Sequence, residues 1–482
     1  MQQPSFTLGV EEEYQIVDPE TRALRAHISR MLADEAFDAL GLKPELHQSM
    51  VELATPVCQT PAEIRRELLR MRGTMNQLLA KDGLAIASAG SHPFSHWWEQ
   101  EITPLERYVG VKQDMGDLAH RLLIFGMHIH VGIEDRELAI DLVNCVRYFL
   151  PHLLCLSTSS PFWIGRNTGL KSYRSSVFRG FPRTGIPTRL SGWSEFEQYV
   201  ETLTDTGSIP NGSKIWWDVR PHYTYPTIEF RICDACTRVD EAVCIAAIVQ
   251  ALAYKLWKLR RDNLMWREYS SRLIEENKWR AMRFGLSGKL IDFGRRQEQP
   301  APVLIRELVE WFIGDVVDEL GTRREVEYVY RILDEGSSAD RQLATFERTG
   351  SLEAVVDQLI AETAEQGLAD QPVTAAAVAR PEGSGVSPHV GLPPLIRSDG
   401  GTQGLDDAAS GRGVPLAVEA GTLAAAANSA AAQSAAAQSA ATSSQGGGNG
   451  HGASGDGVRR SQGPNSSVAP SPRPPAQDDV RP

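Results

Sequence analysis

Three short segments of the chain alternate apolar side chains with polar or ionisable ones, and this two-residue period constrains the fold more than any other feature. The segments are 9–17, 125–133 and 227–232. A period of two is typical of a strand with one face in the core and the other face outside it. The sequence therefore predicts a sheet that packs helices on one side and presents an ionic face to solvent or ligand on the other.

Most of the remaining chain has helical patterning. A helix is predicted over 61–81, where Thr60 suits the N-cap position. Further helices are expected over 138–156 and, with breaks, over 240–366. The segment 160–192 is rich in Gly, Pro, Arg and Ser, so we expect an ordered functional loop there rather than a regular element.

The C-terminal part of the chain has a different composition. No aromatic residue follows Phe346, and the last hundred or so residues are rich in Gly, Ala, Ser, Gln and Pro. Such a composition cannot bury enough apolar surface to offset the entropy lost on ordering. We therefore expect one folded domain over 1–370 and a low-complexity, disordered tail over 371–482.

Charge and hydropathy narrow the class of protein. The formal net charge of −12 argues against a general nucleic-acid binder, which usually shows a basic excess. The longest apolar stretch, 243–254, is too short and interrupted to span a bilayer, and the N-terminus has no signal-peptide pattern. We expect a cytoplasmic protein with neither nucleic-acid nor membrane partners.

The ionic faces of the three segments carry paired candidate residues. Along the chain the pairs are Glu11 with Glu13, His128 with His130, and Glu229 with Arg231. Each pair alone is more typical of a solvated face, of two structural histidines or of a plain ion pair. Two histidines could also bind zinc, but a zinc site requires a third nitrogen or sulfur ligand.

Other ionisable residues fit the pattern less well. Glu45 and Glu52 are seven residues apart, an odd spacing that allows them to converge only across a bulge or a helical turn. Glu12 falls on the apolar face of its strand, and the alternation does not account for it. Cys233 and Cys236 form a single CxxC, which favours two ordinary thiols over a zinc or redox site.

Taken together, the candidate residues form a set dominated by carboxylates. Oxygen-rich sites suit Mg²⁺ or Mn²⁺ better than Zn²⁺. Several carboxylates around one cavity repel one another unless cations lie among them, and two or three divalent ions that hold ATP phosphates would relieve that repulsion. Arg231 would then neutralise charge on a phosphoryl group during its transfer.

Six motifs occur in an order that resembles the glutamate–cysteine ligase type 2 family of carboxylate–amine ligases. They are GVEEEYQIVD, GMHIHVG, LSTSSPFWIGRNTG, WWDVRPH, TIEFR and ENKWRAMRFGL, and the resemblance covers about residues 5 to 370. Three of the motifs also resemble glutamine synthetase. The resemblance implies an α+β, glutamine synthetase-like catalytic domain, with a curved antiparallel sheet and helices packed on one face.

The resemblance also implies roles for individual residues. Metal ligands are implied at Glu11, Glu13, Glu45, Glu52, His128 and Glu229. His130 and Arg231 would lie at the ATP phosphates, and Arg231 and Glu229 would be catalytic. Arg174, Arg179 and Arg183 in the Arg-rich loop are candidates for holding the substrate carboxylate.

The implied reaction needs no protein nucleophile. A carboxylate attacks the γ-phosphoryl group of ATP to give an acyl phosphate, and an amine then displaces phosphate to form an amide. Glutamate and cysteine are the implied amino-acid substrates, with weak activity, and a homodimer is one assembly left open. The alternatives are a phosphotransferase of the same fold, a non-catalytic Mg-ATP-binding regulatory protein, and a zinc hydrolase built on His128 and His130.

Overall fold

The computed structural model describes residues 2–364, and its centre is an antiparallel sheet in the order β10-β11-β5-β1-β3-β2. A further strand, β4, pairs with β1. The strands of this sheet are β1 (Leu8–Val17), β2 (Lys43–Pro44), β3 (Met50–Ala54), β4 (Ala85–Ala87), β5 (Met127–Gly132), β10 (Val219–Pro221) and β11 (Thr227–Phe230). All three segments that alternate in the sequence are strands of this one sheet.

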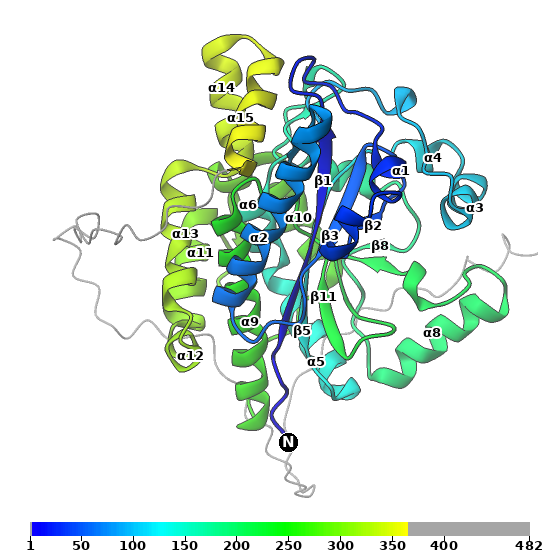
Figure 1. The fold of residues 1–482 in the computed structure, drawn as a ribbon. Helices are drawn as coiled ribbons and strands as arrows, with labels where there is room; N and C mark the ends of the chain where they lie inside the picture. The colour runs from blue at the N-terminus through cyan, green and yellow to red at the C-terminus, as the bar shows by residue number, and fades with distance from the viewer. Residues whose placement is uncertain (1, 365–482) are drawn as a thin grey trace, which may run out of the picture. The chain divides into compact units, whose positions relative to one another are not determined.

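Helices cover the apolar face of the sheet. Those in contact with it are α2 (Pro61–Leu79), α5 (Arg136–Val146), α9 (Val239–Arg261) and, at β4, α15 (Leu352–Ala364). Figure 1 shows the sheet nearly edge-on, with α2 and α9 on one side and α8 (Trp193–Asp205) on the other. As predicted, Thr60 caps α2, and its side chain accepts a hydrogen bond from the Glu63 amide.

Glu12 lies on the apolar face because an arginine meets it there. Arg72 of α2 forms a 2.6 Å ion pair with the Glu12 carboxylate, and both side chains are almost fully buried. Arg72 also donates hydrogen bonds to the backbone carbonyls of Cys236 and Thr237. A buried charge needs such a partner, so this pair fixes α2 against the sheet and the start of α9.

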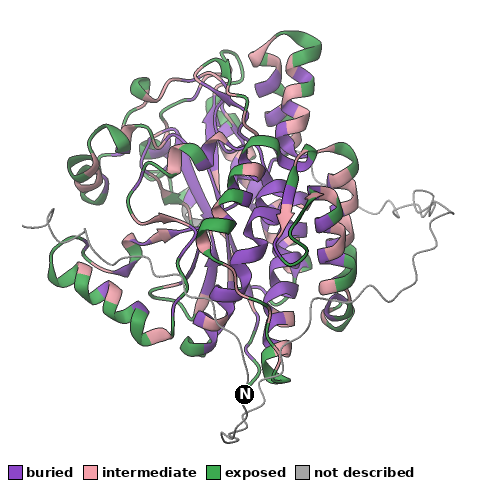
Figure 2. Cartoon of the chain, turned by 180° about the vertical axis from the view of Figure 1, so that it is seen from behind, coloured by how far each residue is buried: buried purple, intermediate pink, exposed green. Residues whose placement is uncertain are grey.

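A second layer of helices packs outside the first. It contains α6 (Leu150–Ser157), α10 (Ser271–Phe284), α11 (Ala301–Glu307), α12 (Gly314–Leu320) and α13 (Arg323–Glu335). Figure 2 shows the strands and the inner helices buried, while much of α8 is exposed. Residues 136–157 and 239–261 are long and apolar enough to cross a membrane, but 89% and 78% of their most apolar windows lie inside the fold, as in core helices.

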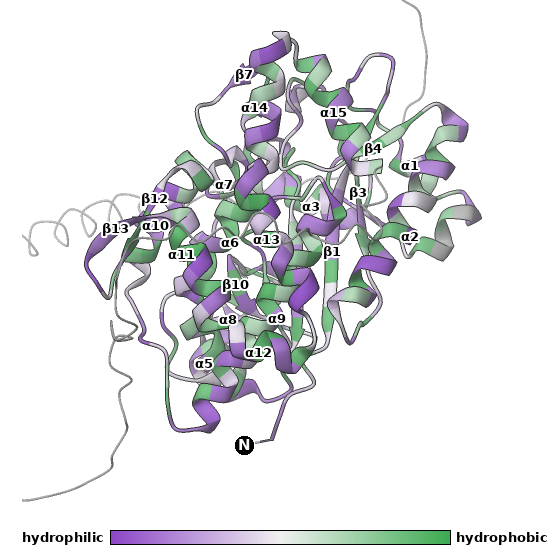
Figure 3. Cartoon of the chain, turned by 90° about the vertical axis from the view of Figure 1, so that its left-hand side faces the viewer, coloured by the Kyte–Doolittle hydropathy of each residue, from purple (hydrophilic) through white to green (hydrophobic). Residues whose placement is uncertain are grey.

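Short elements connect and flank these layers. The helices among them are α1 (Ile28–Met31), α3 (Glu106–Met115), α4 (Asp117–His120) and α7 (Tyr173–Phe178). The strands among them are β6 (Phe162–Trp163), β7 (Arg166–Asn167), β8 (Thr184–Gly185), β9 (Trp216–Trp217), β12 (Lys289–Asp292) and β13 (Gln297–Pro300). Residues 160–192 are thus a loop with three very short strands and one short helix. The β12–β13 hairpin is largely hydrophilic along β13 (Figure 3).

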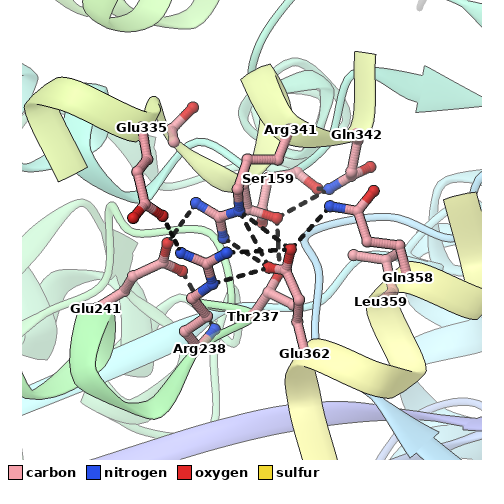
Figure 4. A network of polar contacts seen from close by, with 12 residues as sticks. Ser159, Thr237, Arg238, Glu241, Glu335, Arg341, Gln342, Gln358, Leu359 and Glu362 are labelled. Carbon is pink, nitrogen blue, oxygen red and sulfur yellow. Dashed lines mark hydrogen bonds and ion pairs between the residues drawn. The ribbon is translucent and has the colours of Figure 1, made fainter. Parts of the chain in front are cut away.

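Two C-terminal helices, α14 (Ser338–Thr349) and α15 (Leu352–Ala364), are held by a cluster of ion pairs (Figure 4). Arg341 of α14 pairs with Glu241 of α9 at 2.7 Å and with Glu362 of α15 at 2.9 Å. Arg238, at the N-terminus of α9, pairs with Glu362 at 3.2 Å and with Glu335 of α13 at 2.5 Å. Four helices therefore meet at one charged cluster, which we call the C-terminal clasp.

The α+β class, the antiparallel sheet and the helices on one face are confirmed. Predicted element bounds hold to within a few residues, since α2 ends at Leu79 and a 3₁₀ turn continues to Asp82. The predicted disordered tail over 371–482 lies outside the described residues. The boundary at 370 stays a prediction for the same reason.

Candidate active site

The ionic face of the sheet aligns its residues in cross-strand rows. In the β1–β5 register Glu11 is opposite His128, and in the β5–β11 register His130 is opposite Glu229. In the β1–β3 register Glu13 is opposite Glu52. Because directly opposed residues on one face are neighbours, four strands, β1, β3, β5 and β11, bring their ionisable side chains to the same place.

The first group of potential ligands contains Glu11, His130 and Glu229. One ligand atom from each lies within 4.8 Å of the others. His130 Nε2 is 3.8 Å from Glu11 Oε2, and His128 Nδ1 is 3.3 Å from the same oxygen. His128 Nδ1 also lies 4.0 Å from Glu229 Oε1, so both histidines lie beside the Glu11 and Glu229 carboxylates.

The second group contains Glu13, Glu45 and Glu52, again with ligand atoms within 4.8 Å of one another. A strand reversal brings Glu45 and Glu52 together. β2 runs antiparallel to β3, with Lys43 opposite Glu52, and Glu45 follows β2 directly. The expectation that only a bulge or a helical turn could join the two glutamates is wrong, because it placed both on one continuous strand.

The second group holds its carboxyl groups in an unfavourable setting for negative charge. Burial, reinforced by the charge of Glu52, raises the pKa of Glu13 to about 7. Burial and the charges of Glu52 and Glu13 raise the pKa of Glu45 well above its usual value. Burial raises the pKa of Glu52 as well, with a further contribution from Glu11. The three carboxyl groups of the second group therefore do not all ionise together unless a cation lies among them.

The first group behaves in the opposite way because basic groups surround it. Burial raises the pKa of Glu229, but the charges of Arg231 and Arg220 outweigh burial and hold it well below the usual range. Burial also raises the pKa of Glu11, but the His128 and His130 imidazoles beside it outweigh burial and hold it below the usual range. Both carboxylates are thus ionised and available as ligands at neutral pH.

Three cationic side chains face the two groups. Arg220 Nε donates to Glu229 Oε2 at 2.7 Å, and Arg231 donates to the other oxygen of the same carboxylate. The Lys43 ammonium donates to Glu11 at 3.1 Å and to Glu52 at 2.8 Å. Arg231 Nε has no hydrogen-bond partner among the described residues, although it is buried, so it has a free donor for an anion.

The donor set fits a hard divalent cation. Five carboxylates and one imidazole make up the two groups, and carboxylate oxygen is the ligand that Mg²⁺ and Mn²⁺ prefer. His130 Nδ1 hydrogen-bonds with the Thr227 hydroxyl, while its Nε2 is buried without a hydrogen-bond partner among the described residues. A buried nitrogen without a hydrogen-bond partner, beside two carboxylates, has a lone pair that can coordinate a metal ion.

The three arginines of the Arg-rich loop lie apart from one another. Arg174 is buried, and it donates to the backbone carbonyls of Arg231 and Ile232 at 3.3 and 3.4 Å. It lies against Gly126, where a Cβ would leave it no room, and the Gly126 amide donates to Glu13 at 2.5 Å. Arg174 therefore contacts residues that flank β5 and β11, and its charge lowers the pKa of Glu13 against the effect of burial.

Among the described residues, neither the Arg179 nor the Arg183 side chain forms a hydrogen bond or ion pair with the site carboxylates. Arg179 is exposed at the end of α7. Arg183 is half-buried, with its guanidinium 5.3 Å from the Trp216 ring centre, and its Nε donates to the Lys214 carbonyl. Their proposed contact with a substrate carboxylate stays a prediction.

A small pocket opens beside the first group. It is lined by the start of α5, by Trp193 and by the β10–β11 loop, and it reaches Thr227, the partner of His130. In that loop the rings of His222 and Tyr225 are stacked with centroids 4.7 Å apart. His222 Nδ1 accepts the backbone amide of Tyr225 at 2.9 Å, which fixes the ring. Aromatic faces thus lie next to the candidate metal ligands.

Sequence reasoning missed Lys43, Arg220 and His222. A signal for two of them was present, because Asp218, Arg220 and His222 alternate within the WWDVRPH motif and so share one strand face. Asp218 forms a buried 2.6 Å ion pair with Lys278, which lies in the ENKWRAMRFGL motif. Lys43 gave no signal of this kind, because its strand has only two residues.

Comparison with known sequences gives consistent matches. The sequence profile of glutamate–cysteine ligase family 2 (GCS2) matches residues 7–358. A protein of Herpetosiphon aurantiacus named “Putative glutamate–cysteine ligase 2” is 56% identical over 368 residues, which are 76% of this chain and 95% of that protein. A protein of the same name from Roseiflexus castenholzii is 57% identical over 362 residues, 75% of this chain and 95% of its own.

Solved structures share the fold at low sequence identity. A glutamate–cysteine ligase from Francisella tularensis, in complex with AMP, is 11% identical with a TM-score of 0.55 over 76% of this chain and 89% of its own. A bifunctional glutathione synthetase from Pasteurella multocida is 15% identical with a TM-score of 0.57 over 74% of this chain. The match spans about half of that bifunctional protein, 52% of its chain.

Proposed function

The chain belongs to glutamate–cysteine ligase family 2, and on that premise we propose that it is an ATP-dependent carboxylate–amine ligase that joins glutamate to cysteine. The proposal rests on one observation. The two groups of candidate metal ligands share one face of the sheet, with Arg231 and Arg220 beside them. ATP brings several negative charges, and divalent cations held by these carboxylates would match them.

We propose that Mg²⁺ or Mn²⁺ is held by Glu11, His130 and Glu229 in one group and by Glu13, Glu45 and Glu52 in the other. His128 would support the first group through its contact with Glu11. When bound, the ions would supply positive charge to the phosphates and orient them. The raised pKa values of Glu13, Glu45 and Glu52 support this assignment, because a cation relieves the repulsion that burial creates.

The proposed chemistry has two steps. A substrate carboxylate oxygen attacks the γ-phosphorus of ATP, the bond to the β–γ bridging oxygen breaks, and ADP leaves with the electron pair. The amine nitrogen of the second substrate then attacks the acyl carbon, inorganic phosphate leaves, and the nitrogen loses a proton. Arg231, with its free Nε donor, would stabilise charge on the phosphoryl oxygens in the first step.

The aromatic pocket beside His130 is proposed to hold the base of the nucleotide. It starts at Thr227 and is lined by the stacked rings of His222 and Tyr225 and by Trp193. Flat aromatic faces suit a flat base, and the position places the phosphates toward the first group of ligands. Because ATP is supplied inside cells, we place the proposed activity in the cytoplasm.

A kinetic experiment tests the function directly. ADP release by the full-length protein is measured with Mg²⁺ and ATP, first with glutamate alone and then with glutamate and cysteine. Release that requires both amino acids, together with γ-glutamylcysteine detected by mass spectrometry, is the expected result. A panel of other acids and amines follows, since members of one family differ in substrates.

Three other outcomes would replace the proposal. A stable phosphorylated product without an amide would identify a phosphotransferase of the same fold. Tight Mg-ATP binding without ADP release for any pair of substrates would identify a regulatory protein. Stoichiometric zinc in the purified protein would favour a hydrolase built on His128 and His130.

A further inference from the structure

The three cations that face the carboxylates differ in how firmly they are held. Arg220 and Arg231 are both tied to Glu229, and their side chains are only 7% and 12% exposed. Arg220 is also fixed by the backbone carbonyls of Ser213 and Ile215. The Lys43 side chain, in contrast, is 47% exposed. Two of the cations are therefore permanent parts of the site, and the third has a path to solvent.

Lys43 joins the two groups of ligands. Its ammonium is 3.1 Å from Oε1 of Glu11, which belongs to the first group, and 2.8 Å from Oε1 of Glu52, which belongs to the second. The other oxygen of Glu11 faces His128 and His130. One ammonium thus neutralises a carboxylate of each group.

We propose that Lys43 is a placeholder cation of the metal centre. In the metal-free protein its ammonium neutralises Glu11 and Glu52, and it swings into solvent when divalent ions arrive with the nucleotide. A lysine suits this role, because its ammonium is a point charge on a flexible stem, whereas an arginine is a rigid fork. The proposal rests on the proposed function, since it presumes that the two groups bind metal.

Electrostatics gives the placeholder a consequence for metal affinity. A divalent ion in either group lies next to a carboxylate that Lys43 already holds, so ion and ammonium repel each other. Free ions must therefore displace Lys43, which lowers their affinity. When the ions arrive with a nucleotide, its phosphates bring negative charge that offsets part of the repulsion. The displacement of the Lys43 ammonium then costs less free energy. Lys43 would thus favour binding of the metal–nucleotide complex over binding of the metal alone.

The test measures Mn²⁺ binding to the full-length protein in the absence of nucleotide. Electron paramagnetic resonance gives the concentration of free Mn²⁺ at each point of the titration. We expect Lys43→Gln to bind Mn²⁺ at least about tenfold more tightly than the wild type, because a repelling charge is gone. Lys43→Arg keeps the repelling charge and should bind Mn²⁺ no more tightly than the wild type. Lys81→Gln removes an exposed lysine elsewhere and serves as the matched control. Unchanged or weaker binding by Lys43→Gln would overturn the proposal.

Thermal unfolding gives a second, independent measurement. In a chelator, Lys43→Gln should melt below the wild type, because Glu11 and Glu52 lose their counter-charge, and saturating Mn²⁺ should close or reverse that gap. Equal melting temperatures in the chelator would contradict the placeholder role. If neither the wild type nor Lys43→Gln binds Mn²⁺, the metal centre of the proposed function is wrong, and the inference falls with it. Normal wild-type binding with an unaltered Lys43→Gln contradicts the inference alone.

Discussion

Glu11 and His128 are directly opposed in the β1–β5 register, and His128 Nδ1 lies 3.3 Å from Glu11 Oε2. The same oxygen is 3.8 Å from His130 Nε2, and the other oxygen accepts from Lys43. One carboxylate thus connects both histidines with the lysine. We predict that Glu11→Gln lowers kcat for ADP release by at least about 100-fold, the scale of losing a group that stabilises transition-state charge.

The matched control for that variant is Glu20→Gln, an exposed glutamate in the turn after β1. Both proteins should show the wild-type circular dichroism spectrum and unfold cooperatively, because glutamine has nearly the shape of glutamate. Full turnover in a folded Glu11→Gln protein would remove Glu11 from the proposed metal centre.

Tyr225 should affect nucleotide binding more than catalysis. Its ring stacks on His222 in the pocket proposed for the base, and among the described residues it forms no hydrogen bond with the site carboxylates. Loss of one aromatic contact is worth about 1 kcal/mol, which corresponds to about fivefold in affinity. We therefore expect Tyr225→Ala to raise the KM for ATP about fivefold and to change kcat by less than about twofold. Trp311→Ala, at an exposed ring outside the pocket, should leave both unchanged. An unaltered KM for ATP in Tyr225→Ala would place the base elsewhere.

The sequence predicts the ionic face of the sheet well because strand alternation is a local property. Glu11 and Glu13 share a face whatever lies around them, and the same holds for His128 and His130. That the strands become neighbours depends on pairing across more than a hundred residues. Periodicity within one strand does not indicate which strands pair. The expectation of one antiparallel sheet came from the family resemblance that the six ordered motifs carry.

Features that depend on chain reversal or on distant partners could not be predicted. Glu45 meets Glu52 because the chain turns between β2 and β3, and no strong turn motif marks the reversal. Strand alternation does not account for Glu12, because its partner Arg72 lies sixty residues later in the sequence and contacts it only in the folded core. The role of Lys43 is of the same kind, since its strand is too short to show any period.

The C-terminal clasp should contribute strongly to stability. Arg341 is 10% exposed and pairs with Glu241, which is 3% exposed, so its removal leaves a buried carboxylate with fewer partners. Breaking a buried ion pair costs about 3 kcal/mol or more. We expect that loss of unfolding free energy for Arg341→Met in urea denaturation. Arg323→Met removes an exposed pair with Asp318 at 2.5 Å, outside the clasp, and should cost less than about 1 kcal/mol. Equal losses in the two variants would show that the clasp adds nothing beyond a surface pair.

The domain boundary can be tested by truncation. The family match ends at residue 358, and the described fold ends with α15 at Ala364, two residues after the clasp residue Glu362. We expect a protein without residues 381–482 to keep its kcat and to lose less than about 1 kcal/mol of stability, a small part of a typical total. Kinetics and urea denaturation of the shortened and full chains give the comparison. A larger loss would extend the domain beyond 370.

His92 should make the protein less stable in mild acid. The side chain is 1% exposed, its Nδ1 accepts the Ser95 amide at 3.0 Å, and its Nε2 donates to the Arg22 carbonyl at 2.9 Å. Burial lowers the pKa of His92 from 6.5 to about 3. The unfolded chain therefore binds a proton below pH 6.5 that the folded chain does not bind until about pH 3. The stabilising contribution is full above pH 6.5 and declines as the pH falls through this window.

The size of the decline follows from the proton uptake of the unfolded state, about 1.4 kcal/mol for each pH unit. Other buried histidines titrate in the same range, so the useful quantity is the difference in unfolding free energy between the wild type and His92→Gln. Between pH 6.5 and 4.5 we expect that difference to fall by about 2 kcal/mol, because only the wild type has the titrating group. A difference that stays constant over this range would mean that His92 is protonated as easily in the folded protein as in the unfolded chain.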